Sequence, residues 1–377
     1  MKITLDTASL SRELFKLQGI VNSKTTLQIL SNALLEASAD GTLTLKATDL
    51  DITVTTHVAC DVQTPGRVTV KARDLYDAVK NLRSETVTLE KEDNLWVHLT
   101  AGTVRARFVG MDPDEFPATH NADEVTFSEI RTARLLRTIE RTIFSVSTDE
   151  GRPNLTGALM KVTDQGSLMM VSTDGHRLSK AEVSVDFDTE ASPQGLKAGI
   201  IVPRKGLNEL RRTLDTTEEH VQFGMHANHV VFRYGNTTLF VRLIDGTFPN
   251  FAQVVPAEQD ERKALIGRTE LIDRIKFVSL FSNTKTHNLR LALEDDTCTI
   301  SAQDPDKGEC EEKVPIIYTG PAVRAGFNYR YLLDVLQVVD GEQVSLEIID
   351  TLSPTIVNEL EGEDGDQSIF IVMPMRI

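Results

Sequence analysis

Leu30 to Asp49 reads LSNALLEASADGTLTLKATD, and Leu155 to Asp174 reads LTGALMKVTDQGSLMMVSTD. The two segments align without a gap at an offset of about 125 residues. A third and weaker copy, LRLALEDDTCTISAQD, runs from Leu289 to Asp304, about 130 residues after the second. Repetition at such a long period is typical of a chain built from repeated structural units, so we interpret the sequence as three homologous repeats.

The ends of the repeats also correspond. Phe116 and Pro117 close the first repeat, Phe248 and Pro249 close the second, and the third runs to the last residue. The segment FPNFAQVVPAEQDERK combines proline with charged residues and indicates a linker. We therefore predict three domains, at residues 1–124, 125–254 and 255–377, each long enough to bury its own core.

Within the first repeat the hydrophobic period changes between that of a strand and that of a helix. A short strand, MKITLD, precedes Leu10, Leu14 and Leu17 at helical spacing, and three alternating segments follow. The same order then restarts at RVTVKA. We predict an α+β fold in which each repeat is a doubled β-α-β-β-β motif, with antiparallel sheets that carry helices on one face. The six helices are predicted at residues 7–19, 71–83, 131–141, 204–212, 268–276 and 324–334.

Charge is distributed unevenly over these elements. The net charge of the chain is -16, which by itself argues against nucleic acid as a partner. The six helical segments, however, sum to about +11, which leaves about -27 for the rest. A simpler explanation is that Lys and Arg favour helix surfaces, but Glu favours them equally and is scarce here. If all six helices line one face of a closed ring, DNA threaded through it is retained topologically and needs only weak contacts.

The sequence offers no catalytic or metal-binding pattern. Cys60, Cys298 and Cys310 form no CxxC pair, so we expect reduced cysteines and no bound metal or other cofactor. His176 lies near Ser172 and Asp174, but neighbours along one segment do not make a nucleophile, base and orienting group. HExxH and GxxxxGK[ST] are absent, so we expect no enzyme. Without a signal-peptide pattern or a long apolar run, we expect a cytoplasmic protein that contacts no membrane.

Three motifs together resemble the DNA polymerase III beta subunit family, the bacterial sliding clamps. They are STDGHR at Ser172 to Arg177, DGTFPNF at Asp245 to Phe251 and VMPMRI at Val372 to Ile377. The resemblance covers the full length in order. It implies a head-to-tail homodimer whose six domains form a ring with helices lining the hole, a processivity factor in the bacterial cytoplasm at the nucleoid. The implied partners are double-stranded DNA, the replicative polymerase alpha subunit, a clamp-loader ATPase, and other polymerases and repair proteins that carry short Leu/Phe peptides.

The resemblance also implies a hydrophobic cleft for those peptides, formed by the second domain and the C-terminal tail. The cleft positions are Arg152, Leu155, Thr173, Gly175, His176, Arg177, Leu178, Pro249, Val254, Ile371, Val372, Met373, Pro374, Met375, Arg376 and Ile377. Two methionines in the tail can repack around different ligands. Alternatively, the tail is only the last strand of the core.

Two further surfaces follow from the same resemblance. The expected DNA contacts are Lys24, Arg73, Pro153, Asn154, Arg204 and Lys205, and the expected subunit interface places Arg105, Arg107 and Phe108 against Leu280, Phe281, Glu309, Glu311 and Glu312. Two rival hypotheses remain. A repeat-built enzyme needs an asymmetric polar cluster, which the sequence lacks, and a trimeric clamp needs two repeats per chain instead of three.

Overall fold

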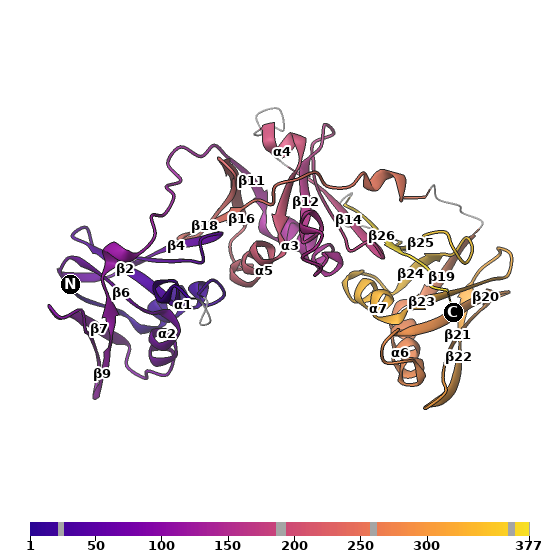
Figure 1. Ribbon diagram of the computed structural model, residues 1–377, viewed down its shortest axis with the longest axis horizontal. Coiled ribbons are helices and arrows are strands. Elements are labelled where there is room, and N and C mark those ends of the chain that lie inside the picture. The colour runs from indigo at the N-terminus through magenta and orange to yellow at the C-terminus, as the bar shows by residue number, and fades with distance from the viewer. Residues whose placement is uncertain (22–25, 186–193, 257–261, 361–365, 377) are drawn as a thin grey trace. The chain divides into compact units, whose positions relative to one another are not determined.

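The computed structural model describes residues 1–377 except 22–25, 186–193, 257–261, 361–365 and 377. The chain folds into two compact units (Figure 1). The first unit holds residues 1–133 and 205–243, and the second holds residues 134–204 and 244–377. The second repeat therefore contributes strands to both units.

The first unit contains two antiparallel sheets covered by helices. One sheet has the order β5 (Asp61–Thr64), β1 (Lys2–Asp6), β7 (Thr86–Lys91), β8 (Val97–Ala101) and β9 (Val104–Phe108). The other has the order β10 (Gly110–Met111), β6 (Gly66–Lys71), β2 (Asn32–Ser38), β3 (Thr42–Thr48), β4 (Ile52–Ala59), β18 (Thr237–Arg242), β17 (His229–Tyr234), β16 (His220–His226) and β11 (Phe127–Arg131). Its helices are α1 (Thr7–Leu17), α2 (Ala72–Lys80) and, from Lys205 onward, α5 (Arg204–Thr213).

The second unit is built on one long sheet. The strand order is β15 (Ile200–Pro203), β12 (Gly157–Val162), β13 (Ser167–Thr173), β14 (Arg177–Ser184), β26 (Gln367–Val372), β25 (Thr355–Glu359), β24 (Gln343–Glu347), β19 (Lys263–Gly267), β22 (Gly308–Ile317), β21 (Thr297–Asp304), β20 (Asn288–Glu294) and β23 (Val323–Asn328). Its helices are α3 (Thr132–Glu140, from Arg134 onward), α4 (Gln194–Ala198), α6 (Arg268–Val278) and α7 (Tyr329–Val338).

The element order confirms the doubled β-α-β-β-β motif in all three repeats. The first reads β1-α1-β2-β3-β4 and then β6-α2-β7-β8-β9, and the same order recurs from β11 and from β19. In α1 the predicted spacing holds, since Leu10, Leu14 and Leu17 are all fully buried. The helix begins where the Asp6 side chain accepts a 2.7 Å hydrogen bond from the Ser9 amide, which satisfies a free donor of the first turn.

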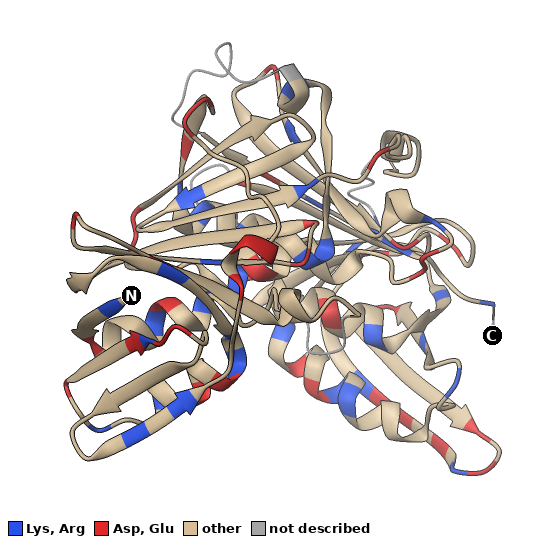
Figure 2. Ribbon diagram, turned by 60° about the vertical axis from the view of Figure 1, so that its left-hand side comes forward, with Lys and Arg blue, Asp and Glu red and all other residues tan. Residues whose placement is uncertain are grey.

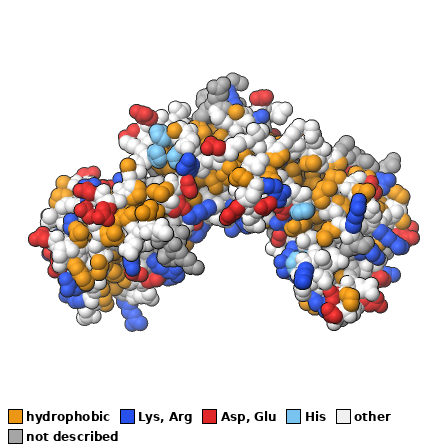
Figure 3. All heavy atoms as spheres, viewed as in Figure 1, with side chains coloured by type: hydrophobic (Ala, Val, Ile, Leu, Met, Phe, Trp, Pro, Cys, Tyr) orange, Lys and Arg blue, Asp and Glu red, His pale blue; other side chains and the backbone are white. Residues whose placement is uncertain are grey.

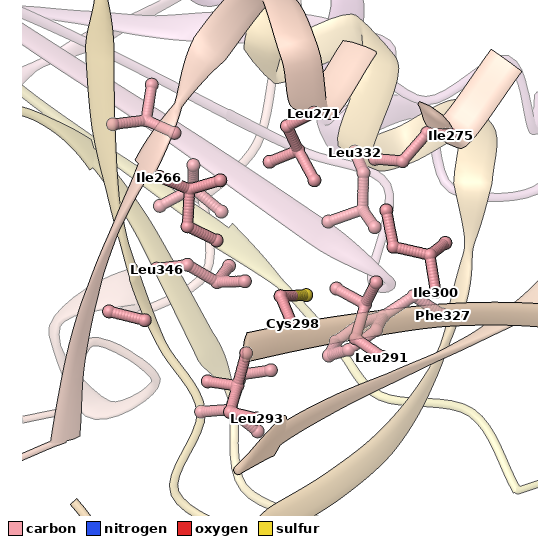
Figure 4. Packing of buried hydrophobic residues seen from close by; sticks show 14 of the residues in the cluster. Ile266, Leu271, Ile275, Leu291, Leu293, Cys298, Ile300, Phe327, Leu332 and Leu346 are labelled. Carbon is pink, nitrogen blue, oxygen red and sulfur yellow. The ribbon is translucent and has the colours of Figure 1, made fainter. Parts of the chain in front are cut away.

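The core of the third repeat shows how a helix covers a sheet (Figure 4). Leu271 and Ile275 of α6 pack over Leu291, Cys298 and Phe327 from three neighbouring strands. All of these side chains are at most 3% exposed. Burial raises the pKa of the Cys298 thiol to about 12, so this cysteine acts as a small hydrophobic side chain. Cys60, Cys298 and Cys310 are free, as the sequence predicted.

The sheets run from one repeat into the next. In the first unit β4 of repeat one pairs antiparallel with β18 of repeat two, and Ile52 lies opposite Val241. In the second unit β14 of repeat two pairs with β26 of repeat three, and Arg177 lies opposite Val372. Each junction therefore joins the fourth strand of one repeat to the last strand of the next.

The structure corrects the last predicted helix. Residues 324–334 do not form one helix, because Val323–Asn328 is strand β23 and the helix begins only at Tyr329. Ala325 and Phe327 are buried at strand spacing and pair with β20, and the Asn328 side chain caps the helix by accepting from the Arg330 amide at 3.0 Å. The short helix α4 and strand β5 were also not predicted from the sequence.

The charge of the helices is smaller than the sequence suggested. Within their observed bounds the six long helices carry net charges of +1, 0, +1, +3, +1 and 0 in chain order. Figure 2 shows basic and acidic residues together on these helices. Much of the expected excess came from flanking residues such as Arg83 and Arg131, which lie just outside the helices. Only α5 is strongly basic.

Candidate functional site

Seven buried side chains form one hydrophobic cluster in the second unit. We call it the cleft cluster, and it comprises Leu155, Met169, Val171, Leu178, Ile201, Phe248 and Ile371. Partly buried Phe251 and Val255 pack against it, and Val254 beside them is 46% exposed. Hydrophobic side chains also gather on the visible surface where Figure 1 shows β14 and β26 (Figure 3). The structure thus brings the three predicted positions Leu155, Leu178 and Ile371 together in one buried apolar cluster.

The turn between β13 and β14 forms the polar side of this cluster. Asp174 folds the turn, because its Oδ1 accepts hydrogen bonds from the amides of His176 (2.9 Å) and Arg177 (3.0 Å). Gly175 has a φ of +91°, which L side chains rarely adopt, and His176 is exposed. Thr173 closes the turn by donating from Oγ1 to the Arg177 carbonyl at 2.6 Å.

Arg152 lies directly over this turn. Its Nε donates to Asp149 Oδ2 at 2.9 Å, and its second guanidinium nitrogen donates to the Asp174 carbonyl at 3.1 Å. A Cβ atom at Gly175 would lie 2.9 Å from the Arg152 guanidinium. Glycine at this position therefore lets the arginine approach the backbone of the turn.

The Arg177 side chain is engaged by neighbouring groups of the chain. Its guanidinium donates to Asp174 (3.0 Å), to Asp334 (2.5 Å) and to the Phe144 carbonyl (2.5 Å). It also lies 4.4 Å from the centre of the Tyr331 ring. A guanidinium with these partners holds α7 and the turn together, so Arg177 supports the framework of the candidate site.

The C-terminal tail continues past the last strand. Val372 is buried and ends β26, whereas Met373, Pro374 and Met375 are half-buried and Arg376 is exposed. The Met373 amide donates to the His176 carbonyl at 2.8 Å, and the Met375 amide donates to the Gly326 carbonyl at 2.7 Å. Ile377 lies outside the described residues. Val372 therefore belongs to the last core strand, and the half-buried residues after it stay attached to the sheet through the bridge between Met375 and Gly326.

The same backbone contact recurs in the other repeats. Gly110 pairs with Val70 of β6, and the Ile244 amide donates to the Ile201 carbonyl of β15 at 3.0 Å. Met375 makes the equivalent contact with β23. The path of the tail is therefore set by the repeat architecture, and its two methionine side chains are what distinguish it.

No hydrolytic arrangement exists around His176. The Ser172 side chain is fully buried and donates its hydroxyl hydrogen to the Thr142 carbonyl. The Asp174 carboxylate is occupied by the amides of its own turn and by Arg177. Across the described part of the chain no three His, Cys, Asp or Glu side chains are placed to hold a metal ion.

The predicted DNA contacts differ in how free their side chains are. Arg73 is well exposed, with Asp77 4.0 Å away. Lys205 is half-exposed and forms an ion pair with Asp49, while Arg204 beside it is half-buried. Pro153 is exposed, and the Asn154 side chain donates to the Thr247 carbonyl at 3.1 Å. Lys24 lies outside the described residues.

One basic residue counted with the helices is unavailable to any ligand. The side chain of Arg141 is 3% exposed and donates to Glu359 at 2.5 Å and to Ser368 at 2.7 Å. Conversely, Arg211 of α5 is exposed but was not among the predicted contacts. The sequence could not distinguish the roles of these two arginines, because both lie in segments with helical spacing. Only the fold shows that Arg141 faces a buried carboxylate and that Arg211 is exposed.

The predicted interface residues lie on two strands and one helical turn. Arg105 and Arg107 are exposed on β9, the edge strand of its sheet, and Phe108 is half-buried. Glu309 and Glu311 are exposed on β22, and Glu312 lies 3.6 Å from Arg274. Leu280 is 64% exposed, whereas Phe281 packs against the core of the third repeat. The residues on β9 belong to the first unit, and those on β22 and near Leu280 belong to the second.

Three repeats of a doubled β-α-β-β-β motif, joined through continuous sheets, define the class of DNA-clamp proteins. The three family models that match the chain describe the N-terminal, central and C-terminal domains of the DNA polymerase III beta subunit, at residues 1–120, 129–250 and 252–376. The chain is 33% identical to the beta sliding clamp of Pseudomonas putida and 32% identical to that of Escherichia coli K12, in both cases over 100% of each chain. A crystal structure of the Pseudomonas aeruginosa sliding clamp bound to griselimycin superposes with a TM-score of 0.91 at 31% identity, covering 100% of both chains.

The chain therefore belongs to the DNA polymerase III beta subunit family, the beta sliding clamps. Members of that family are non-catalytic subunits of the polymerase and serve as its processivity factor. None of the described helices is long and apolar enough to cross a membrane. Sequence reasoning missed Met169, Phe248 and Phe251 as parts of the candidate cleft. Phe248 and Phe251 lie in the DGTFPNF motif that carried the resemblance.

Proposed function

We propose that two copies of this chain form a head-to-tail ring around duplex DNA and hold partner proteins through the cleft cluster. One observation supports the ring above all others. Inside the chain, the fourth strand of a repeat pairs twice with the last strand of the next repeat, as β4 with β18 and β14 with β26. The last strand of repeat one, β9, and the first half of β22 in repeat three lack this partner among the described residues.

The internal junctions also give the register of the missing pair. Ile52 faces Val241 and Arg177 faces Val372, and the equivalent positions in the third junction are Gly308 and Phe108. Antiparallel pairing from this point sets Arg107 opposite Glu309 and Arg105 opposite Glu311 of a second copy. Opposite charges on facing strand positions favour this pairing, and like charges oppose it. Phe108, Leu280 and Phe281 supply the apolar part of the same interface.

The proposed contacts with DNA come mainly from the basic helix α5 and the exposed Arg73. Lys205, Arg204 and Lys24 add charge, and Pro153 and Asn154 offer polar or backbone contacts. A ring retains DNA topologically, so a modest positive lining is enough and tight phosphate contacts would hinder sliding. The acidic remainder of the chain repels other DNA.

The proposed partner site is the cleft cluster with its polar border. Its border comprises Arg152, Thr173, Gly175, His176, Pro249 and Val254, together with the tail from Val372 to Ile377. A buried apolar floor with a few orienting polar groups suits short peptides with Leu and Phe anchors. Such peptides are carried by the replicative polymerase alpha subunit, the clamp-loader ATPase, and other polymerases and repair proteins. We also propose domain boundaries between residues 124 and 125 and between residues 254 and 255. When bound to DNA, the protein is associated with the nucleoid.

Retention on DNA tests the ring. Labelled protein loaded by a clamp loader onto nicked circular DNA should remain bound through gel filtration at moderate salt. Cutting the same DNA with a restriction enzyme should release it, because a topological link ends when the DNA has free ends. Equal retention on circular and linear DNA would show ordinary surface binding and would refute the ring.

Replacing Gly175 tests the polar border of the cleft. In the variant Gly175→Ala the new methyl group meets Arg152, so the arginine must move and peptide affinity should fall about fivefold, a loss of about 1 kcal/mol. Gly166→Ala is the matched control, since Gly166 also has a positive φ (+80°) but nothing lies within 4 Å of its would-be Cβ. Both variants should lose about 1 kcal/mol of stability from backbone strain. Titration calorimetry with a Leu/Phe peptide should separate them, and equal affinities would remove Arg152 from the site.

A further inference from the structure

The two junctions inside the chain share a contact made by the tenth residue counted from the start of a helix. At the first junction Lys16 of α1 donates from Nζ to the Thr237 hydroxyl at 2.9 Å. At the second junction Arg141, just after α3, donates to the Ser368 hydroxyl at 2.7 Å. Thr237 and Ser368 occupy the same position in β18 and β26 by strand register. Each internal junction is thus closed by a cation on a hydroxyl.

Both cations are also paired with a buried carboxylate. Lys16 lies 2.7 Å from Glu13, whose side chain is 2% exposed, and Arg141 lies 2.5 Å from Glu359, whose side chain is 4% exposed. The Glu13 carboxylate also accepts a hydrogen bond from the Thr56 hydroxyl of β4. The Arg141–Glu359 pair joins two repeats, so opening the second junction would leave a buried charge without its partner. Lys16 and Glu13 both lie on α1, so opening the first junction removes only the hydrogen bond from Lys16 to Thr237.

The third junction has apolar residues at both positions. The tenth residue counted from the start of α6 is Phe277, and the strand position equivalent to Thr237 and Ser368 is Val104 of β9. Phe277 is 52% exposed and Val104 is 43% exposed, so both side chains are available for contact with another chain. The Phe277 ring lies 6.4 Å from the Phe281 ring, so it continues the proposed interface.

We infer that Phe277 of one copy packs on Val104 of a second copy, so that an apolar contact closes the subunit junction where a buried cation closes the internal ones. The inference rests on the proposed ring. Three observations indicate that β9 of a second copy occupies the surface formed by α6 and β22. They are the equivalence of the repeats, the packing of α6 against β22, and the complementary charges of β9 and β22. Arg274 of α6 occupies the position of Glu13 in α1, and Glu312 of β22 occupies the position of Thr56 in β4. Arg274 and Glu312 lie 3.6 Å apart, so Glu312 already has a partner within its own chain.

The difference assigns separate tasks to the three junctions. When the subunit junction opens, Phe277 and Val104 only gain water, and no charge buried at this helix position loses its partner. When the second internal junction opens, the buried Arg141–Glu359 ion pair must be broken and hydrated. When the first internal junction opens, the largely buried Lys16 ammonium loses its hydrogen bond to the Thr237 hydroxyl. The subunit junction is therefore the one whose helix layer can open for DNA and close again without taking a hydrogen-bond or ion-pair partner from a largely buried cation at this helix position.

A double-mutant cycle tests the contact. Dimer dissociation constants are measured by sedimentation for wild type, Phe277→Ala, Val104→Ala and the double variant. A ring has two such interfaces, so a tenfold loss at each makes Phe277→Ala about a hundredfold weaker, and Val104→Ala about tenfold weaker. The double variant should stay well below the thousandfold product, because each change removes the same contact. The control is Leu352→Ala, which truncates an exposed apolar side chain outside the proposed interface and should leave the dimer dissociation constant unchanged.

The outcomes separate this inference from the ring itself. A monomeric wild-type protein would refute the proposed ring. A dimeric wild type with an unaffected Phe277→Ala variant, or with fully additive effects, would refute the Phe277 contact alone. Unchanged thermal unfolding of the monomeric variants should show that the exposed side chains contribute to association and not to folding.

Discussion

Reversing both arginines of β9, in the variant Arg105→Glu/Arg107→Glu, should convert the dimer to a monomer of 41.8 kDa at micromolar concentration. In the proposed register each new glutamate faces Glu311 or Glu309 of the second copy. A ring contains four such like-charge pairs, and each costs on the order of 1 kcal/mol or more at a partly exposed strand edge. The dimer dissociation constant should therefore rise by at least about a thousandfold, measurable by light scattering.

The complementary variant provides the control. Glu309→Arg/Glu311→Arg should also be monomeric alone, because its own β9 arginines now face arginines. Mixing the two variants should restore a dimer with one copy of each. In that heterodimer one junction has both charges exchanged and the other has the original charges, so both are attractive. A mixture that stays monomeric would show that the register is wrong.

Deleting Met373 to Ile377 should abolish peptide binding and leave the ring intact. The deletion removes the two tail methionines and the 2.8 Å and 2.7 Å backbone hydrogen bonds from Met373 and Met375 to His176 and Gly326. Anchor contacts in such grooves commonly contribute about 2 kcal/mol each, so the combined loss should exceed a hundredfold in peptide affinity. Polymerase processivity should fall with it, because tethering works through effective concentration.

The controls for the deletion are dimer mass and retention on nicked circular DNA, both in the truncated protein. Neither should change, since the proposed subunit contacts lie on β9, β22 and the end of α6. The double variant Met373→Ala/Met375→Ala keeps the backbone hydrogen bonds and removes only the side chains. If it binds peptide normally while the deletion does not, the tail acts through its backbone. A dissociated dimer after deletion would mark the tail as part of the structural core.

The repeat pattern predicted most of the fold because burial periodicity is a local signal. Leu10, Leu14 and Leu17 define one face of a helix, and the same spacing is legible wherever a helix covers a sheet. The signal failed at residues 324–334, where Ala325 and Phe327 are buried at strand spacing directly before a helix. Short apolar segments of this kind fit either period, and only the neighbouring strand β20 decides between them.

The candidate site was harder to predict because the sequence does not reveal the partners of polar side chains. Arg177 belongs to the motif that carried the resemblance, yet its guanidinium is taken up by Asp334, more than 150 residues away in the chain. Arg141 was counted toward a basic surface, but Glu359 buries it. In both cases a carboxylate far away in the sequence determines the role of the arginine. The sequence pattern around the arginine does not indicate this partner.

The polarity of the two free strand edges has a consequence for how copies of this chain can polymerise. Every copy carries one free edge of each kind, on β9 and on β22, so an open chain of copies could in principle extend like a filament by joining unlike edges. Two β22 edges repel each other through their glutamates, and two β9 edges repel through their arginines, so growth has a single direction. A ring of two copies pairs both of these edges at once, and growth of such a filament ends there.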